Sequence, residues 1–408
     1  MACNPRASHL AVLLVFLLIS GSQGPTPNHE ARLLLQLKTR LTDASRHLGN
    51  WNTSTSMDGS PCTWTGVRCS AAASGSAPPV VTSLDLRGMA LSGTIAASIG
   101  GLVSLRNLDM SYNSLSGAIP PEIGSCRRLV RLELHNNRFH GRIPPDLGKL
   151  SGLVTCRLHG NRLHGPVPAE IGDMASLEHL ALYNNSLTGY LPPSIGKLKN
   201  LRTLRLGGNL ISGNIPVEIF ECGRLVFLGL AHNQLEGPVP KELGRLNHLE
   251  DLYLYANHLS GTIPMEIGNC TNLRTMALYN NDLIGAIPAT VGNLRYLELL
   301  FLYKNSLNGT IPSVIGNLSL LTEIDFSDNF LTGGIPKELG NIRGLYRLQL
   351  YTNRLEGPVP KEIGNLSCAE HIELSNNSLT GRIPKEIGNM RRLTSLGLSN
   401  NLLTGFIP

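Results

Sequence analysis

The sequence predicts an α/β repeat solenoid, a chain of coils whose short strands form a parallel sheet along one face. Three observations predict it. From Val81 onward the 408-residue sequence repeats every 24 residues without insertion or deletion. Two apolar residues spaced two apart recur in each repeat, in most repeats as two leucines such as Leu204 and Leu206, and a strand turns such alternate side chains to one face. Asparagine and glycine then follow at fixed offsets, as at Asn209 and Gly213.

The repeating unit reads LxxLxLxxNxLxGxIPxxIGxL, which is a leucine-rich repeat. Fourteen copies occupy residues 81–408, and the last is incomplete, so the sequence is interpreted as a fragment of a longer protein or as a truncated gene product. An Asn side chain both donates and accepts hydrogen bonds, so a stacked Asn column can satisfy backbone groups where each coil turns. Because strands lie about 4.8 Å apart, fourteen coils are expected to extend about 65–70 Å along the sheet.

Residues 1–24 are typical of a secretory signal peptide, because a basic start precedes the apolar run LAVLLVFLLIS and small residues follow it. That run is shorter than the roughly 20 residues that span a bilayer. The chain is therefore expected in the secretory pathway and outside the cell, with membrane attachment only through a segment after Pro408. Seven Asn-x-Ser/Thr sequences fit this route and predict glycosylation. They are Asn52, Asn184, Asn269, Asn308, Asn317, Asn365 and Asn376.

Residues 25–80 lack the repeat and are predicted to form an N-terminal cap, which the first coil needs because it would otherwise expose its apolar end. The segment EARLLLQLKTRL, with leucines at 33, 34, 37 and 41, predicts an amphipathic helix. Trp51 and Trp64 are expected to cover the end of the solenoid. In a secreted protein, a local pair such as Cys62 and Cys69 predicts a disulfide.

No catalytic, metal-binding or nucleic-acid-binding pattern stands out from the repeat. The net charge is +6, and the basic residues are scattered rather than clustered. His135, His159 and His179 fall on adjacent coils and could in principle bind a metal or act as a base, but an open strand face favours a polar recognition patch. We therefore expect no cofactor and no enzyme within these residues. Three acidic residues are interpreted as solvated surface: Asp109, Glu133 and Asp325.

Four positions in each repeat point outward from the sheet, and they hold the candidate ligand-binding residues. Leu and Ile already fill the core positions, so an aromatic stripe on this face indicates a partner site. We expect an extended peptide there, with its acidic or polar part at a basic end and its apolar part on the tyrosines. The basic end is predicted at Arg157, His159, His179 and Arg205. The aromatic stripe is predicted at Tyr183, Phe227, Tyr253, Tyr255, Tyr279, Phe301 and Tyr303.

With the cap CTWTGVRC, the Gly-x-Ile-Pro repeat and the signal peptide, the sequence resembles the extracellular domains of plant leucine-rich-repeat receptor-like kinases, over essentially all of residues 25–408. Runs such as LVFLGLAHNQLEGPVPKELG are similar to the subgroup that includes receptors for secreted peptides. The resemblance implies a right-handed superhelix that binds a secreted peptide or protein on its concave face. It also implies a single transmembrane helix and a cytoplasmic Ser/Thr kinase farther along the chain, and a co-receptor kinase recruited by the ligand.

The run RLGG is the most specific match within that resemblance. Receptors for root meristem growth factor peptides carry Arg-x-Gly-Gly before the repeat Asn, where the motif recognises a sulfated tyrosine. Arg205, Gly207 and Gly208 match it, and they lie on the exposed strand face outside the repeat consensus. The two glycines could equally reflect tolerance of small residues, so both interpretations stay open. The alternative for the whole chain is a soluble binding protein, such as a polygalacturonase inhibitor with a cysteine-bearing C-terminal cap, or a truncated decoy receptor.

Overall fold

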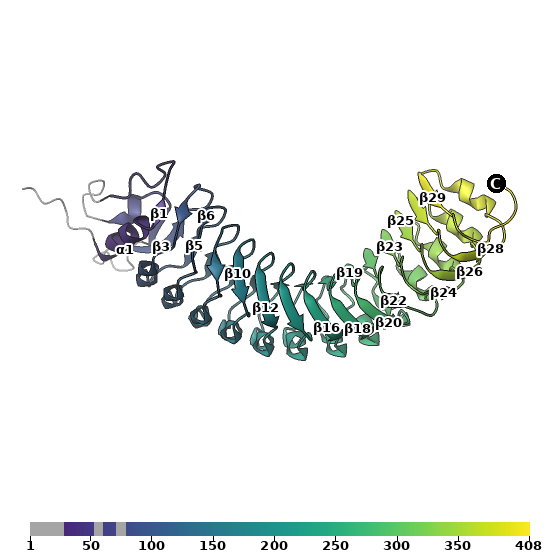
Figure 1. The fold of residues 1–408 in the computed structure, drawn as a ribbon, viewed down its shortest axis with the longest axis horizontal. Helices are drawn as coiled ribbons and strands as arrows, with labels where there is room; N and C mark the ends of the chain where they lie inside the picture. The colour runs from purple at the N-terminus through teal and green to yellow at the C-terminus, as the bar shows by residue number, and fades with distance from the viewer. Residues whose placement is uncertain (1–27, 53–59, 71–78) are drawn as a thin grey trace, which may run out of the picture.

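The computed structural model describes residues 28–52, 60–70 and 79–408. The predicted signal peptide, residues 1–24, lies outside the described residues. The chain winds through successive coils into an open arc, with the strands stacked side by side and short helical turns along the outer edge of the first half of the arc (Figure 1). The predicted α/β solenoid with one long parallel sheet is therefore confirmed.

Each coil contributes one strand to the main sheet, and this sheet carries the candidate site. After the first pair, β2 and β3, which is antiparallel, every neighbour is parallel, and the register joins each residue to the one 24 positions later, as Arg205 joins Gly229. Its strands are β2 (Val67–Ser70), β3 (Val80–Asp85), β5 (Asn107–Asp109), β7 (Arg131–Glu133), β9 (Thr155–Arg157), β11 (His179–Ala181), β13 (Thr203–Arg205), β15 (Phe227–Gly229), β17 (Asp251–Tyr253), β19 (Thr275–Ala277), β21 (Leu299–Phe301), β23 (Glu323–Asp325), β25 (Arg347–Gln349), β27 (His371–Glu373) and β29 (Ser395–Gly397).

The cap supplies the first short strand and the first 3₁₀ helix, and each complete coil then makes a second short strand and a 3₁₀ helix before it returns to the main sheet. The second strands are β1 (Leu41–Thr42), β4 (Ser92–Gly93), β6 (Ser114–Leu115), β8 (His140–Gly141), β10 (Arg162–Gly165), β12 (Ser186–Tyr190), β14 (Leu210–Gly213), β16 (Gln234–Pro238), β18 (His258–Thr262), β20 (Asp282–Gly285), β22 (Ser306–Leu307), β24 (Thr332–Gly333), β26 (Arg354–Pro358) and β28 (Ser378–Thr380). The 3₁₀ helices are η1 (Pro61–Thr63), η2 (Ala97–Gly101), η3 (Pro121–Ser125), η4 (Pro145–Lys149), η5 (Ala169–Asp173), η6 (Pro193–Lys197), η7 (Val217–Glu221), η8 (Lys241–Arg245), η9 (Met265–Asn269), η10 (Ala289–Asn293), η11 (Ser313–Asn317), η12 (Lys337–Asn341), η13 (Lys361–Asn365) and η14 (Lys385–Asn389).

The repeat asparagine joins two successive coils in the way its chemistry predicts. Asn209 is buried, and its Oδ1 accepts the backbone N–H of Leu187 in the preceding coil at 3.0 Å. Its Nδ2 donates to the carbonyl oxygen of Leu206 at 2.9 Å and to that of Leu182 at 3.2 Å. One side chain thus satisfies backbone groups that the turn leaves without strand partners. The same bonds recur at Asn233, so the column holds successive coils in a fixed register.

The N-terminal cap covers the apolar end of the first coil. Helix α1 runs over His29–Lys38, and Asn28 accepts the N–H of Ala31 at 2.7 Å to cap it. The helix ends before Leu41, which begins β1, so that leucine does not belong to the predicted helical face. In the ranges that the structure describes, no helix combines the length and the apolar character that crossing a bilayer requires.

Aromatic packing and one disulfide complete the cap. Trp51 and Trp64 are both buried, and their rings stack with centroids 5.7 Å apart. A disulfide joins Cys62 to Cys69, so it ties η1 to β2 across the short loop between them. The stapled cap that the sequence predicts is present, and it leaves the outward face of the main sheet uncovered for the site.

Candidate ligand-binding site on the concave face

The register of the main sheet places equivalent residues of successive coils side by side, so each outward position forms a column. In one such column, rings pack face to face. The centroids of His159 and Tyr183 are 4.2 Å apart, and those of Tyr255 and Tyr279 are 4.3 Å apart. Tyr303 continues the second stack at 4.2 Å from Tyr279. The predicted stripe residues Tyr255, Tyr279 and Tyr303 therefore form a stacked aromatic wall, because each ring is held on its neighbour.

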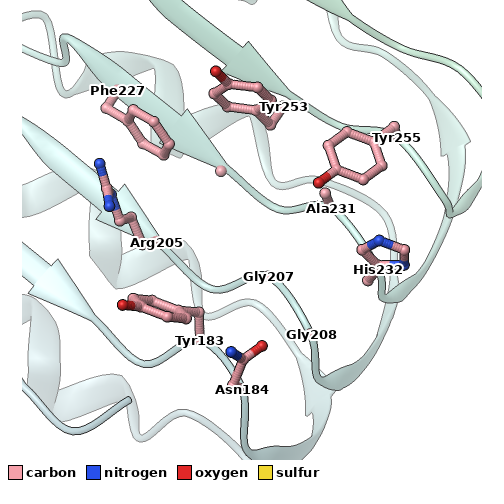
Figure 2. A pocket seen from close by; sticks show the side chains of 11 residues that line it. Tyr183, Asn184, Arg205, Gly207, Gly208, Phe227, Ala231, His232, Tyr253 and Tyr255 are labelled. Carbon is pink, nitrogen blue, oxygen red and sulfur yellow. The ribbon is translucent and has the colours of Figure 1, made fainter. Parts of the chain in front are cut away.

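The column is broken at two successive coils, where Gly207 and Ala231 stand in place of rings. The break opens a hollow of about 410 Å³, which we call the basic hollow. Figure 2 shows Tyr183 and Tyr255 on opposite sides of the chain segments that carry Gly207 and Ala231. The basic hollow is lined by Tyr183, Asn184, Arg205, Gly207, Gly208, Phe227, Gly229, Ala231, His232, Tyr253 and Tyr255.

Arg205 supplies the formal positive charge of the basic hollow. Its side chain is exposed, and its guanidinium carbon lies 4.1 Å from the centroid of the Phe227 ring. This cation–π contact fixes the guanidinium against one wall while its N–H donors stay available to a ligand. An anionic group carried on a planar ring could therefore stack in the break of the column and meet Arg205 at its edge.

The two glycines of the RLGG run have different roles. Gly208 has a φ of +65°, and the equivalent residue of every other described coil also has positive φ, for example Ala256 at 54°. This corrects the expectation that Gly208 is no part of the scaffold, because glycine suits this left-handed position without strain. Gly207 has no such need. A Cβ there would lie 3.0 Å from the carbonyl oxygen of Ala231, so its absence keeps the floor of the hollow low.

The polar stretch before the basic hollow contains a buried carboxylate, which corrects the prediction that Glu133 is solvated. Its side chain is 3% exposed. The guanidinium groups of Arg131 and Arg157 lie 3.2 and 3.3 Å from Oε1, and His135 Nδ1 lies 3.3 Å from Oε2. Burial acts to raise the pKa of Glu133, but the neighbouring His135 and Arg157 outweigh it and hold that pKa below its usual value. Arg157 is thus partly neutralised by its own neighbour.

The two predicted histidine contacts are less basic than expected. His159 is only 8% exposed between the rings of His135 and Tyr183, and burial with nearby positive charge lowers its pKa to about 4. Burial also lowers the pKa of His179, whose Nδ1 lies 3.1 Å from the Thr203 hydroxyl. Both rings are therefore neutral near pH 7, and the positive charge of this region belongs to its arginines. Within the described ranges, no group of three His, Cys, Asp or Glu side chains is arranged as a metal site.

A second hollow of about 270 Å³, the acidic hollow, follows the basic hollow along the sheet and shares two of its tyrosines. It is lined by Tyr253, Tyr255, Ala277, Tyr279, Phe301, Tyr303, Glu323, Asp325 and Arg347. Asp325 is only 9% exposed, so the prediction that it is solvated is wrong, and burial raises the pKa of its carboxyl group. The prediction for Asp109 is also wrong in part, because its carboxylate is half-buried and accepts hydrogen bonds from Ser111.

The structure distributes the predicted contacts over three adjoining hollows. Tyr183, Arg205, Gly207, Gly208, Phe227, Tyr253 and Tyr255 line the basic hollow. Arg157, His159 and His179 line a third hollow beside it, together with Tyr183 and Arg205. Tyr279, Phe301 and Tyr303 line the acidic hollow. Sequence reasoning missed Ala231, Gly229, Glu323, Asp325 and Arg347, although the first two could have been found as small residues that break otherwise bulky columns.

The predicted glycosylation positions remain predictions, and the structure places them as follows. All except the half-buried Asn52 are exposed. Asn184 lies at the rim of the basic hollow, where its Oδ1 is 2.5 Å from the position that a Cβ of Gly208 would take. A glycan at Asn184 would therefore stand beside the candidate ligand site.

Three family descriptions match the chain. The leucine rich repeat N-terminal domain matches residues 27–70, a leucine-rich repeat region matches 233–358, and the leucine rich repeat itself matches five stretches between 104 and 390. A probable leucine-rich repeat receptor-like protein kinase of Arabidopsis thaliana is 51% identical over 94 residues, which are 23% of this chain and 8% of that relative. The first curated relatives are each matched over 6–8% of their length, so the match spans only a small part of them.

Solved structures extend the likeness to most of the chain. A TDR receptor shares 32% identity and a TM-score of 0.66 over 80% of this chain and 65% of its own. Arabidopsis HAESA, solved with the peptide hormone IDA and the co-receptor SERK1, shares 26% identity and a TM-score of 0.57 over 93% of this chain and 87% of its own. A leucine-rich repeat protein of Leptospira interrogans shares 32% identity and a TM-score of 0.58 over 77% of this chain and 84% of its own. The chain belongs to the leucine-rich repeat family, and it is similar to the ectodomains of plant leucine-rich-repeat receptor kinases.

Proposed function

We propose that the chain is the ligand-binding ectodomain of a plant cell-surface receptor-like kinase, and that it binds an extended secreted peptide along its concave face. The observation that carries this proposal is the two-residue break in the aromatic column, with Arg205 at its edge. The likeness to HAESA, which was solved with a peptide hormone and a co-receptor, supports a peptide ligand and a co-receptor kinase. A membrane span and a Ser/Thr kinase in the parent protein belong to the same proposal.

The anchor of the ligand in the basic hollow is an anionic aromatic side chain, for which a sulfated tyrosine is the natural candidate. Its ring would occupy the space above Gly207 and Ala231, between Tyr183 and Tyr255. Its anionic group would accept charge-assisted hydrogen bonds from the Arg205 guanidinium. The Arg-x-Gly-Gly match supports this choice, although Gly208 also has a backbone reason to be glycine.

The test compares two arginines of one coil. The secreted protein is titrated by calorimetry with synthetic peptides of about ten residues that carry tyrosine O-sulfate or plain tyrosine at the same position. Arg205→Ala should weaken binding of the sulfated peptides about tenfold or more, since a hydrogen bond to a charged group contributes about 1.5–3 kcal/mol. Arg202→Ala should bind as the wild type does, because Arg202 is exposed outside the hollow. Equal binding of sulfated and plain peptides to the wild type would contradict the proposal.

A further inference from the structure

The basic and acidic hollows adjoin each other on the concave face and carry opposite charge. They share Tyr253 and Tyr255 as a common wall. Arg205 is the one lysine, arginine, aspartate or glutamate that lines the basic hollow, whereas the acidic hollow has Glu323, Asp325 and Arg347. A ligand that occupies both hollows therefore meets a positive site at one end and a net negative site at the other.

Within the acidic hollow, Asp325 carries the uncompensated charge. Arg347 Nη1 lies 3.2 Å from Glu323 Oε2, so these two side chains neutralise each other. Asp325 Oδ1 accepts the N–H of Ser327 at 3.0 Å and its hydroxyl at 2.6 Å. Within the described chain these are the hydrogen bonds that the carboxylate makes, so Oδ2 keeps its lone pairs for a donor from outside. A carboxylate that is nine-tenths buried with one free oxygen favours a cationic partner.

The aromatic walls favour the same class of ligand. Tyr303 and Phe301 line the acidic hollow from the coil before Asp325. A guanidinium or ammonium group above a ring face gains cation–π attraction, and it gains a charge-assisted hydrogen bond where a carboxylate adjoins the ring. Neutral or anionic side chains gain neither contact.

The strand register sets the spacing between the two sites. Arg205 in β13 and Asp325 in β23 occupy the same column, five strand intervals apart. At about 4.8 Å per interval they are separated by about 24 Å, which an extended peptide covers in about seven residues.

We propose that the acidic hollow is a cation subsite that takes a basic side chain of the ligand, arginine or lysine, about seven residues from the anionic residue in the basic hollow. This inference rests on the proposed peptide-binding function and adds a second anchor to it. It predicts a ligand with two opposite charges at a fixed separation, so that neither an acidic nor a basic peptide alone has full affinity.

The experiment uses an array of synthetic ten-residue peptides, acetylated and amidated to remove terminal charges. Each peptide carries tyrosine O-sulfate near one end and a single arginine moved through the remaining positions, in both chain directions, on a neutral background. The labelled wild-type protein is compared with Asp325→Asn and with the control Asp109→Asn. The control is matched because Asp109 Oδ1 accepts the same two hydrogen bonds, from the N–H and hydroxyl of Ser111, but lines none of the three hollows. Asparagine keeps the Oδ1 acceptor in both variants, so the coil retains its local bonds.

The wild type and the Asp109→Asn control should bind best when arginine lies about seven residues from the sulfated tyrosine. Asp325→Asn should lose that preference and bind the best peptide about tenfold more weakly. If the wild type binds sulfated peptides equally for all arginine positions, or if Asp325→Asn matches the wild type, the cation subsite is refuted and the proposed function survives. If the wild type binds no sulfated peptide better than a neutral one, the proposed function fails as well.

Discussion

Filling the break in the aromatic column should weaken ligand binding while it raises the stability of the fold. Ala231→Tyr places a ring next to Tyr255, where the column already stacks Tyr255 on Tyr279 at 4.3 Å. Ala231 already carries a Cβ and does not have positive φ, so the backbone needs no rearrangement. A stacked aromatic pair contributes about 0.5–1.5 kcal/mol, so the protein should be stabilised by about 1 kcal/mol, even though the new ring occupies the basic hollow.

Two measurements on the same variant test this reasoning. Thermal unfolding should shift upward by about 1–2 °C, since a chain of this size gains little Tm per kcal/mol. Calorimetric titration with a sulfated-tyrosine peptide should show binding weakened at least about tenfold, because the ring takes the space above Gly207. Ser399→Tyr is the control, since it adds a ring to the exposed far end of the same column. Undiminished peptide binding by Ala231→Tyr would refute the assignment of this hollow, and a clear loss of stability would refute the stacking geometry.

Three further predictions concern the frame and its titration. Asn209→Ala should destabilise the protein by about 2 kcal/mol in denaturant unfolding, because it leaves the buried Leu187 N–H without a partner, whereas Asn185 and Asn233 still donate to the carbonyl oxygens of Leu182 and Leu206; an effect below about 1 kcal/mol would contradict the role of the column. His159→Phe should keep the ring stack but remove a titration. The pKa of His159 is about 4 in the folded protein and about 6.5 in the unfolded chain, so the unfolded chain binds a proton first as the pH falls. The wild type should therefore lose stability between about pH 6.5 and pH 4, by about 2 kcal/mol at pH 5, and His159→Phe should lack this loss. Parallel pH–stability curves for the two proteins would refute this. Gly208→Asn should fold within about 1 kcal/mol of the wild type, as Asn184 holds the same left-handed angle, but should bind the sulfated peptide about tenfold more weakly; unchanged binding would show that Gly208 serves the backbone alone.

The sequence predicted the frame well because one local pattern is repeated without a break. Leu204, Leu206 and Asn209 have the same neighbours in every coil, so the strand, the core and the Asn column follow from a single repeat. The tyrosine column also followed, since a fixed 24-residue register decides which side chains become neighbours across strands. Periodicity thus fixes both the face of the sheet and the column in which a residue lies.

Periodicity does not reveal how far the neighbouring side chains extend above the sheet. The wrong predictions about which site residues are solvated have this cause. Glu133 points outward, as expected, but Arg131 and Arg157 cover it. Asp325 also points outward, yet it is nearly buried in a column next to large rings. The neutral state of His159 depends on the rings above and below it. Each of these outcomes depends on three coils together, whereas the sequence was interpreted one repeat at a time.

The position of Asn184 has a consequence for the whole population of molecules. Its side chain stands at the rim of the basic hollow, and Asn184 begins an Asn-x-Ser sequence. An oligosaccharide added there during secretion would cover the entrance of the basic hollow, while the buried core of the solenoid would be unaffected. Enzymatic trimming or omission of this one glycan would then divide a single gene product into molecules that bind the ligand and molecules that do not, with no change in amino-acid sequence.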